Sequence, residues 1–238
     1  MNIRAYWWNH IPNFGDRLTP LLLSRFSNIK AEWAPITEAR LVGVGSILDH
    51  IPDQWSGIII GAGKLFPDFE FKATKRMQIL ALRGKLSAKG IKGEYALGDP
   101  GLLASELVKV ETKKYNLGII PHWSDRALAQ RPEFQKYNPK IINPQDDPLE
   151  VIRTIGECRK IVSSSLHGII VADSFGIPRR FEYAKQFDRE GGIYKFQDYS
   201  SAINAPFEEG TLITAPRFHV EDRQHELFDA FQELRELL

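Results

Sequence analysis

Short apolar runs, each bounded by glycine or proline, recur through the chain. Apolar and polar residues do not alternate within a run, which is typical of strands buried on both faces, as in a parallel sheet. Helical patterns lie between the runs, and this alternation of strand and helix predicts an α/β fold. The predicted strands are Ile3–Trp8, Leu41–Ile47, Gly57–Gly63, Ile79–Leu82, Leu117–Pro121, Ile161–Ser164 and Arg180–Tyr183.

The helical segments carry start and stop signals of their own. The segment that begins at Pro148 follows Asp146 and Asp147, and an acidic cap with proline in the first turn is a common helix start. The C-terminal segment places its apolar side chains near one face, so we expect it to pack against the core. The predicted helices are Leu18–Phe26, Gly84–Gly90, Pro148–Cys158, His167–Phe175 and His219–Leu238.

A polar, charged stretch at Val108–Asn116 divides the chain, and a fresh apolar run starts directly after it. A length of 238 residues fits one large domain or two small ones. We expect two Rossmann-like halves, residues 1–110 and 111–238, the second of which ends in the helix 219–238.

The composition is that of an ordinary globular protein. Hydrophobic residues make up 43% of the chain and charged residues 26%, and the net charge of +1 gives no global footprint for nucleic acid. The single cysteine, Cys158, excludes an intrachain disulfide and a multi-cysteine zinc site. The N-terminus lacks the pattern of a signal peptide and no apolar stretch is long enough to span a bilayer, so we expect a cytoplasmic protein.

Several candidate site residues directly follow predicted strands, where the loops of a doubly wound sheet line the ligand crevice. Asn13, Gly15 and Asp16 lie between the first strand and the first helix, whose free N–H groups suit an anion. Gly61 and Gly63 end an apolar run and permit close approach of the backbone to a ligand. The structural alternatives are a turn at Gly15, a helix cap at Asp16 and tight strand–loop turns at the other glycines.

Arg83 ends a predicted buried strand, although arginine is rarely buried without a partner. Its planar guanidinium suits a carboxylate or a phosphate. The structural alternative is a pair with a nearby carboxylate such as Asp99.

A polar cluster, Ser163–Gly168, lies between a predicted strand and an apolar helix. His167 opens that helix, where the helix dipole disfavours the imidazolium ion, and a neutral imidazole can donate or accept a proton near pH 7. The alternative is that His167 and Ser165 merely satisfy the free N–H groups of the helix. The other candidate binding residues in this half are Ser164, Ser165, Gly168, His122 and Arg126.

The spacing of His, Asp and Glu matches no known metal site such as HExxH, so we expect no bound metal. The serine-hydrolase motif G-x-S-x-G is absent. Basic residues are scattered among acidic ones, so we expect no nucleic-acid partner.

In these residues the chain resembles the polysaccharide pyruvyl transferase family, in particular the branch that decorates succinoglycan-like exopolysaccharides. The matching pieces occur in the family's order and cover most of the chain up to about Ala202. They are NFGDRLTP (Asn13–Pro20), LVGVGSIL (Leu41–Leu48), IIIGAG (Ile58–Gly63), LRGKLSAKGI (Leu82–Ile91), LGDPGLLA (Leu97–Ala104), IIPHWSD (Ile119–Asp125) and SSSLHGIIVADSFGIP (Ser163–Pro178).

The resemblance implies a glycosyltransferase-B-like architecture, in which two Rossmann-like halves face a cleft. It implies phosphoenolpyruvate as the donor substrate and a pyruvate ketal on a sugar of an exopolysaccharide precursor as the product, with phosphate released and no cofactor. His167 is then the first candidate for acid–base catalysis on the donor side, and Asp16 is the candidate that orients or deprotonates the sugar hydroxyl. A lipid-linked oligosaccharide acceptor would bring the protein to the inner face of the cell membrane.

Ser165 departs from the family pattern, because several members carry arginine two positions before the motif histidine. If that arginine binds the donor's anionic groups, Arg83, Arg126 or another cation must take its place here. The residues also fit a glycosyltransferase with a nucleotide-sugar donor, a related enzyme with altered chemistry, or a non-catalytic module that binds a sugar or a nucleotide.

Overall fold

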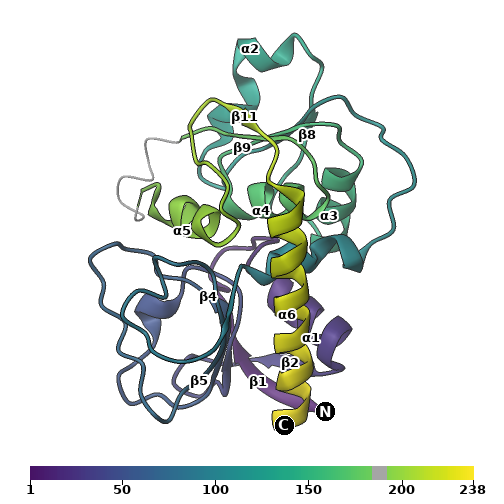
Figure 1. Ribbon diagram of the computed structural model, residues 1–238. Coiled ribbons are helices and arrows are strands. Elements are labelled where there is room, and N and C mark those ends of the chain that lie inside the picture. Colours follow the sequence, from purple (N-terminus) through teal and green to yellow (C-terminus); the bar gives the residue numbers. More distant parts are fainter. Residues whose placement is uncertain (184–191) are drawn as a thin grey trace.

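The computed structural model describes residues 1–183 and 192–238, which form two sheets surrounded by helices and loops (Figure 1). The first sheet has six parallel strands in the order β2-β1-β3-β4-β5-β6, and the second has five strands in the order β11-β10-β9-β7-β8. The α/β fold class is therefore confirmed. The strands of the first sheet are β1 (Asn2–Tyr6), β2 (Lys30–Trp33), β3 (Leu41–Val42), β4 (Ile58–Ala62), β5 (Gln78–Leu82) and β6 (Ala96–Leu97).

Each strand predicted from the sequence is present, whereas the four strands that the apolar runs missed are all sheet edges. β2 and β6 flank the first sheet, and β8 and β11 flank the second. An edge strand is less completely covered, so it has no need of a continuous apolar run. The strands of the second sheet are β7 (Gly118–Ile120), β8 (Lys140–Ile141), β9 (Ile161–Ser163), β10 (Arg179–Phe181) and β11 (Leu212–Ile213).

Two Rossmann-like halves would each contain a wholly parallel sheet. The second sheet differs from this expectation, because β11 pairs antiparallel with β10. An antiparallel edge strand on an otherwise parallel sheet is a common addition. Here the strand leads into α6 (Arg217–Leu237), which runs back to the first sheet and contacts β5, β6 and α1 (Leu18–Ser27) (Figure 1). The predicted C-terminal helix is confirmed and begins slightly earlier than expected.

Helices do not cover both faces of the first sheet. One face packs against α1, α6 and the 3₁₀ segment η2 (Pro100–Leu107). The other face, which carries Val42 and Ile59, packs against side chains such as Ile51 and Trp55 from loops and the 3₁₀ turn η1 (Leu48–His50). The predicted helix Gly84–Gly90 forms turns instead, and the N–H groups of Lys85 and Ser87 bond to side chains of a later helix.

The remaining helices surround the second sheet and connect it to the first. They are α2 (Pro132–Gln135), the 3₁₀ segment η3 (Arg126–Gln130), α3 (Pro148–Gly156), α4 (Leu166–Ser174) and α5 (Tyr194–Ala202). Asp147 caps α3 by accepting hydrogen bonds from Leu149 N and Glu150 N, as the sequence predicted. No helix in the described part of the chain is long and apolar enough to cross a membrane.

One continuous apolar core joins the two sheets, since Leu18, Leu102, Ile170 and Phe181 belong to the same cluster of buried residues. α5 lies between the sheets and is held from both sides (Figure 1). Its Asp198 pairs with Arg83 after β5, and its Tyr199 donates a hydrogen bond to Asp173 of α4. The division of the chain near residue 110 stays a prediction.

Candidate functional site

The predicted site residues follow the carboxyl ends of strands from both sheets. Asp16 lies in the loop after β1 and Arg83 directly follows β5. Asp99, which the sequence offered only as a structural partner for Arg83, follows β6. His122 follows β7, and His167 follows β9 at the start of α4. Carboxyl ends of parallel strands share one edge of a sheet, where ligands bind in open α/β folds. The fold therefore directs these loops toward the junction of the two sheets.

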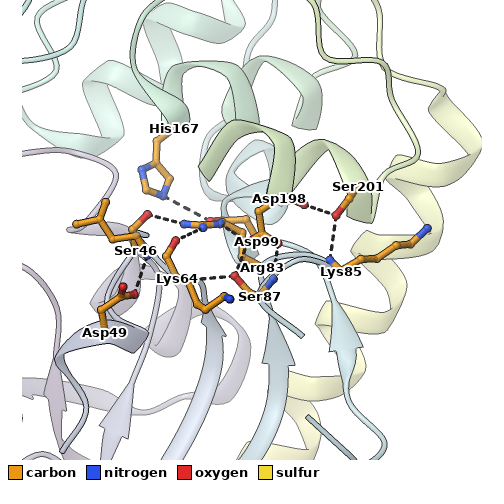
Figure 2. Close-up of polar contacts among 11 residues, drawn as sticks. Ser46, Asp49, Lys64, Arg83, Lys85, Ser87, Asp99, His167, Asp198 and Ser201 are labelled. Atoms are coloured by element: carbon orange, nitrogen blue, oxygen red, sulfur yellow. Dashed lines mark hydrogen bonds and ion pairs between the residues drawn. The ribbon is translucent and has the colours of Figure 1, made fainter. Parts of the chain in front are cut away.

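His167 is the second residue of α4 and is buried, with 6% of its surface exposed. Its ring faces Asp99 across the junction, with 3.7 Å between His167 Nε2 and Asp99 Oδ2 (Figure 2). Neither atom has a hydrogen-bond partner among the residues that the structure describes, although both are buried. Two unsatisfied polar atoms facing each other inside a protein are unusual, and they mark this contact as a functional candidate.

The loop before α1 packs against the same ring. A Cβ atom placed on Gly15 would lie 2.1 Å from His167 Nδ1, so any side chain at this position would displace the imidazole. Phe14 meets the ring edge-on, with 6.3 Å between ring centroids, and Asn13 Oδ1 accepts a hydrogen bond from Gly15 N. The structure thus brings the Asn13–Asp16 loop and His167 together.

The capping alternatives do not describe what is found at these helix starts. The N-cap of α1 is Arg17, whose side chain makes no capping bond, so Asp16 is not the cap of that helix. The N-cap of α4 is Ser165, which also makes no capping bond with its side chain. Instead, Ser163 Oγ accepts a hydrogen bond from Ser165 N.

Burial and neighbouring cations set the protonation states around His167. Burial, followed by the charges of Arg83 and Lys195, lowers the pKa of His167 to about 3. Burial raises the pKa of Asp16 to about 7, an increase that Lys195 opposes. Burial likewise raises the pKa of Asp99 to about 7, against a hydrogen bond from the backbone of Gly101 and the charge of Arg83. Near neutral pH the ring is therefore neutral and both carboxyl groups titrate.

Arg83 is completely buried and bound by three groups (Figure 2). Its Nε donates to Asp198 Oδ2 at 2.9 Å, its Nη1 to Ser46 Oγ at 2.5 Å and its Nη2 to the carbonyl oxygen of Lys64 at 2.6 Å. The sequence left open that Arg83 forms a structural pair with a carboxylate such as Asp99. Arg83 does form such a pair, but its partner is not Asp99. It is Asp198, 115 residues further along the chain, which no local pattern could indicate.

The predicted binding glycines lie against other parts of the chain. A Cβ on Gly61 would lie 2.0 Å from Pro100 Cδ, and one on Gly63 would lie 2.2 Å from the central carbon of the Arg83 guanidinium. A Cβ on Gly168 would lie 2.3 Å from Ser163 Oγ. These glycines permit close packing around Arg83 and at the start of α4.

The other predicted residues of the second sheet divide into two groups. His122 is buried, its N–H donates to Ser164 Oγ at 2.9 Å, and burial followed by the charge of Lys195 lowers its pKa to about 3. Ser164 also bonds to Asp125. Arg126, in contrast, is exposed at the start of η3 and forms no ion pair with any residue that the structure describes.

Comparison with known proteins places these residues in a family. The family model for polysaccharide pyruvyl transferase matches residues 64–181. The succinoglycan biosynthesis protein ExoV of Rhizobium meliloti is 30% identical over 187 residues, which make up 73% of this chain and 57% of that protein. The chain belongs to the polysaccharide pyruvyl transferase family.

An uncharacterized protein of Acanthamoeba polyphaga mimivirus is also similar, with 34% identity over 175 residues, 67% of this chain and 58% of that protein. The chain thus covers less than two thirds of the length of either relative. No solved structure matches the chain.

The part that matches the pyruvyl transferase model contains Arg83, Asp99 and His167, but it excludes two residues of α5 that complete their surroundings. Lys195 and Asp198 are both buried, and Lys195 interacts electrostatically with Asp16, His122 and His167. Sequence reasoning missed both, because α5 is a short polar helix without a recognisable motif. In the described residues, no group of three or more His, Cys, Asp or Glu side chains is arranged to hold a metal ion.

The raised pKa of Asp16 predicts how the free energy of unfolding changes with pH. The pKa of its carboxyl is raised from 3.8 to about 7 in the folded chain, so between these values the folded state keeps a proton that the unfolded state has released. We therefore expect the free energy of unfolding to fall as the pH rises from about 4 to about 7, by up to about 1.4 kcal/mol per pH unit from this group. Asp16→Asn should remove that contribution. Urea denaturation between about pH 5 and about pH 8 measures the difference between the wild type and the variant, and equal slopes in the two proteins would contradict the assignment.

Proposed function

We propose that the chain transfers a pyruvyl unit from phosphoenolpyruvate to a sugar of a surface polysaccharide precursor and forms a pyruvate ketal. The observation that carries this proposal is the buried contact of His167 with the Asn13–Asp16 loop and Asp99, beside two buried cations. It lies within a chain that belongs to the pyruvyl transferase family.

The electrostatics of the site support an anionic donor. Phosphoenolpyruvate carries a phosphate and a carboxylate, which require cations and free N–H groups. Burial is the main cause of the low pKa of the His167 ring, and the positive charges of Arg83 and Lys195 lower that pKa further. Lys195 replaces the arginine that several family members carry at the position of Ser165, and the start of α4 supplies backbone N–H groups.

The reaction needs a proton at C3 of the donor and a base for the sugar hydroxyls. Protonation of C3 makes C2 an oxocarbenium-like centre, and the oxygen of a first sugar hydroxyl bonds to C2 as its proton passes to a base. The C2–O bond to phosphate then breaks, phosphate leaves, and a second hydroxyl of the same sugar closes the ketal and loses its proton. His167 transfers these protons, because a bound dianionic phosphate raises the pKa of the imidazole. Asp16 orients the sugar hydroxyl.

Substrate entry requires the Asn13–Asp16 loop to move away from His167, since Gly15 and the ring are in direct contact. A glycosyltransferase-B-like pair of halves around a cleft would provide that motion, and closure around both substrates would exclude water. The proposed acceptor is a sugar or a lipid-linked oligosaccharide, and the latter would be met at the inner face of the cell membrane.

A coupled assay for phosphate release tests the proposal. With phosphoenolpyruvate as the donor, we expect release that depends on a polysaccharide-precursor acceptor, and mass spectrometry should detect a pyruvate ketal on that acceptor. Thermal stabilisation by a uridine nucleotide, together with none by phosphoenolpyruvate, would contradict the proposal and favour a glycosyltransferase.

A further inference from the structure

The contact between Asp99 and His167 contains two polar atoms that the proposed reaction leaves unexplained. Asp99 Oδ2 and His167 Nε2 are buried and lie 3.7 Å apart, and within residues 1–183 and 192–238 neither has a hydrogen-bond partner. A buried polar atom without a partner is costly, so native structures retain few of them. The two atoms come from different sheets, and they are complementary if one of them carries a proton.

We propose that Asp99 is a positioning residue whose Oδ2 accepts a hydrogen bond from the Nε2–H of His167, so that Nδ1 is the nitrogen that exchanges protons with the substrate. This role rests on the function proposed above. At 3.7 Å the pair is longer than a hydrogen bond, but a carboxylate at this distance already favours the ring tautomer whose proton is on Nε2, and the contact can tighten further when substrate binds. A carboxylate that fixes the tautomer of a catalytic histidine is an established device in other enzymes.

The Asp99 side chain is held in the orientation that this role requires. Asp99 is the N-cap of η2, and its Oδ1 accepts a hydrogen bond from Gly101 N at 2.8 Å. Pro100 follows as the first residue of η2, and η2 packs directly against α4, the helix that begins with Leu166 and His167. With Oδ1 engaged by the cap, Oδ2 remains directed at the imidazole (Figure 2).

The other ring nitrogen lies on the side where the acceptor is expected. Nδ1 is the ring atom nearest to the position that a Cβ of Gly15 would occupy, and Gly15 directly precedes Asp16. A ring that is protonated at Nε2 has its lone pair at Nδ1. The proposed arrangement therefore directs a base toward the loop that orients the sugar hydroxyl.

The protonation of Asp99 sets the pH range in which this hydrogen bond forms. Burial raises the pKa of Asp99 to about 7, so the carboxylate that accepts the bond predominates above that pH. Below it, the protonated carboxyl group can donate to Nε2 and favour the other tautomer. The charged and titratable groups that face Asp99 and its partner are His167 on α4, Asp16 before α1, Arg83 after β5, and Lys195, Asp198 and Tyr199 on α5.

Nitrogen NMR of the ¹⁵N-labelled imidazole rings tests the tautomer directly, without substrate. The His167 signals are assigned by their loss in His167→Gln. At about pH 8.5, above the pKa of Asp99, we expect protonated Nε2 and unprotonated Nδ1 in the wild type. In Asp99→Asn, the side-chain oxygen keeps the bond from Gly101 N and the amide donates to Nε2, so the proton should move to Nδ1. A wild-type ring protonated at Nδ1, or an unchanged tautomer in a folded Asp99→Asn protein, would overturn the proposal.

The kinetic test compares Asp99→Asn with Asp147→Asn. Asp147 caps α3 in the same way, but it is exposed and therefore controls for the loss of a helix-cap charge. We expect Asp99→Asn to lower kcat by about 100-fold with little change in the KM for phosphoenolpyruvate, and to abolish the rise of kcat with pH through about 7. Asp147→Asn should leave kcat and its pH dependence unchanged. Because the tautomer is measured without substrate, it decides the role of Asp99 even if no acceptor supports phosphate release.

Discussion

Replacement of His167 by glutamine is expected to lower the turnover number by about 100-fold or more, because general acid–base catalysis typically contributes 10²–10⁴. Glutamine keeps a polar side chain next to Asp99 and Gly15, but it has no group that titrates. Phosphate release at saturating phosphoenolpyruvate and acceptor measures the rate, and thermal unfolding with circular dichroism shows that the fold is retained.

His225→Gln is the matched control, since His225 is an exposed histidine on α6 and should tolerate the same substitution without loss of rate. Near wild-type turnover in a folded His167→Gln protein would remove His167 from the mechanism. It would also leave the buried contact with Asp99 without a catalytic purpose.

Asp198→Ala is expected to lower the free energy of unfolding by about 3–5 kcal/mol, the range typical when one partner of a buried ion pair is removed. Asp198 and Arg83 are both fully buried. The carboxylate of Asp198 also accepts hydrogen bonds from Ser87 N at 2.8 Å and Ser87 Oγ at 2.5 Å. Its loss would leave a buried guanidinium charge without a counter-ion and would loosen α5. Guanidinium chloride denaturation measures the effect.

The control is Glu221→Ala, which removes the partner of Arg217 from an exposed pair on α6 and should leave the unfolding midpoint unchanged. If the Asp198→Ala protein were as stable as the control, water or another acceptor would be shown to compensate the buried charge of Arg83. Arg83→Lys extends the test. A purely structural role predicts a lower melting temperature and an unchanged KM for phosphoenolpyruvate, whereas a raised KM would place Arg83 on the donor as well.

Much of the fold could be predicted from local pattern. Runs such as Ile58–Ala62 are buried along their whole length, and a strand covered on both faces needs apolar residues at every position. The helices that have an apolar face or a cap signal, such as α3 with Asp147, were predicted for the same local reason. The segments that were missed, which include the edge strands, α2 and α5, are short and carry no continuous apolar run.

The sequence also located the loops of the candidate site, since parallel strands place their carboxyl ends at one edge of a sheet. It could not identify the partners within the site. Asp99 was named as an alternative partner for Arg83, but it faces His167, while Asp198 is bonded to Arg83 from 115 residues further along the chain.

The sequence by itself therefore determined the α/β class, most of the interior strands and helices, and the motif loops that carry Asp16, Arg83 and His167. Each of these depends on periodicity or on turn residues within a few positions of one another. Only the tertiary structure decided that Asp99 and His167 meet, that α5 connects the two sheets, and that burial raises the pKa of Asp16 and Asp99 to about 7. The physical reason is that pairing and burial depend on which distant segments pack together, and a local pattern contains no information about a partner beyond its own element.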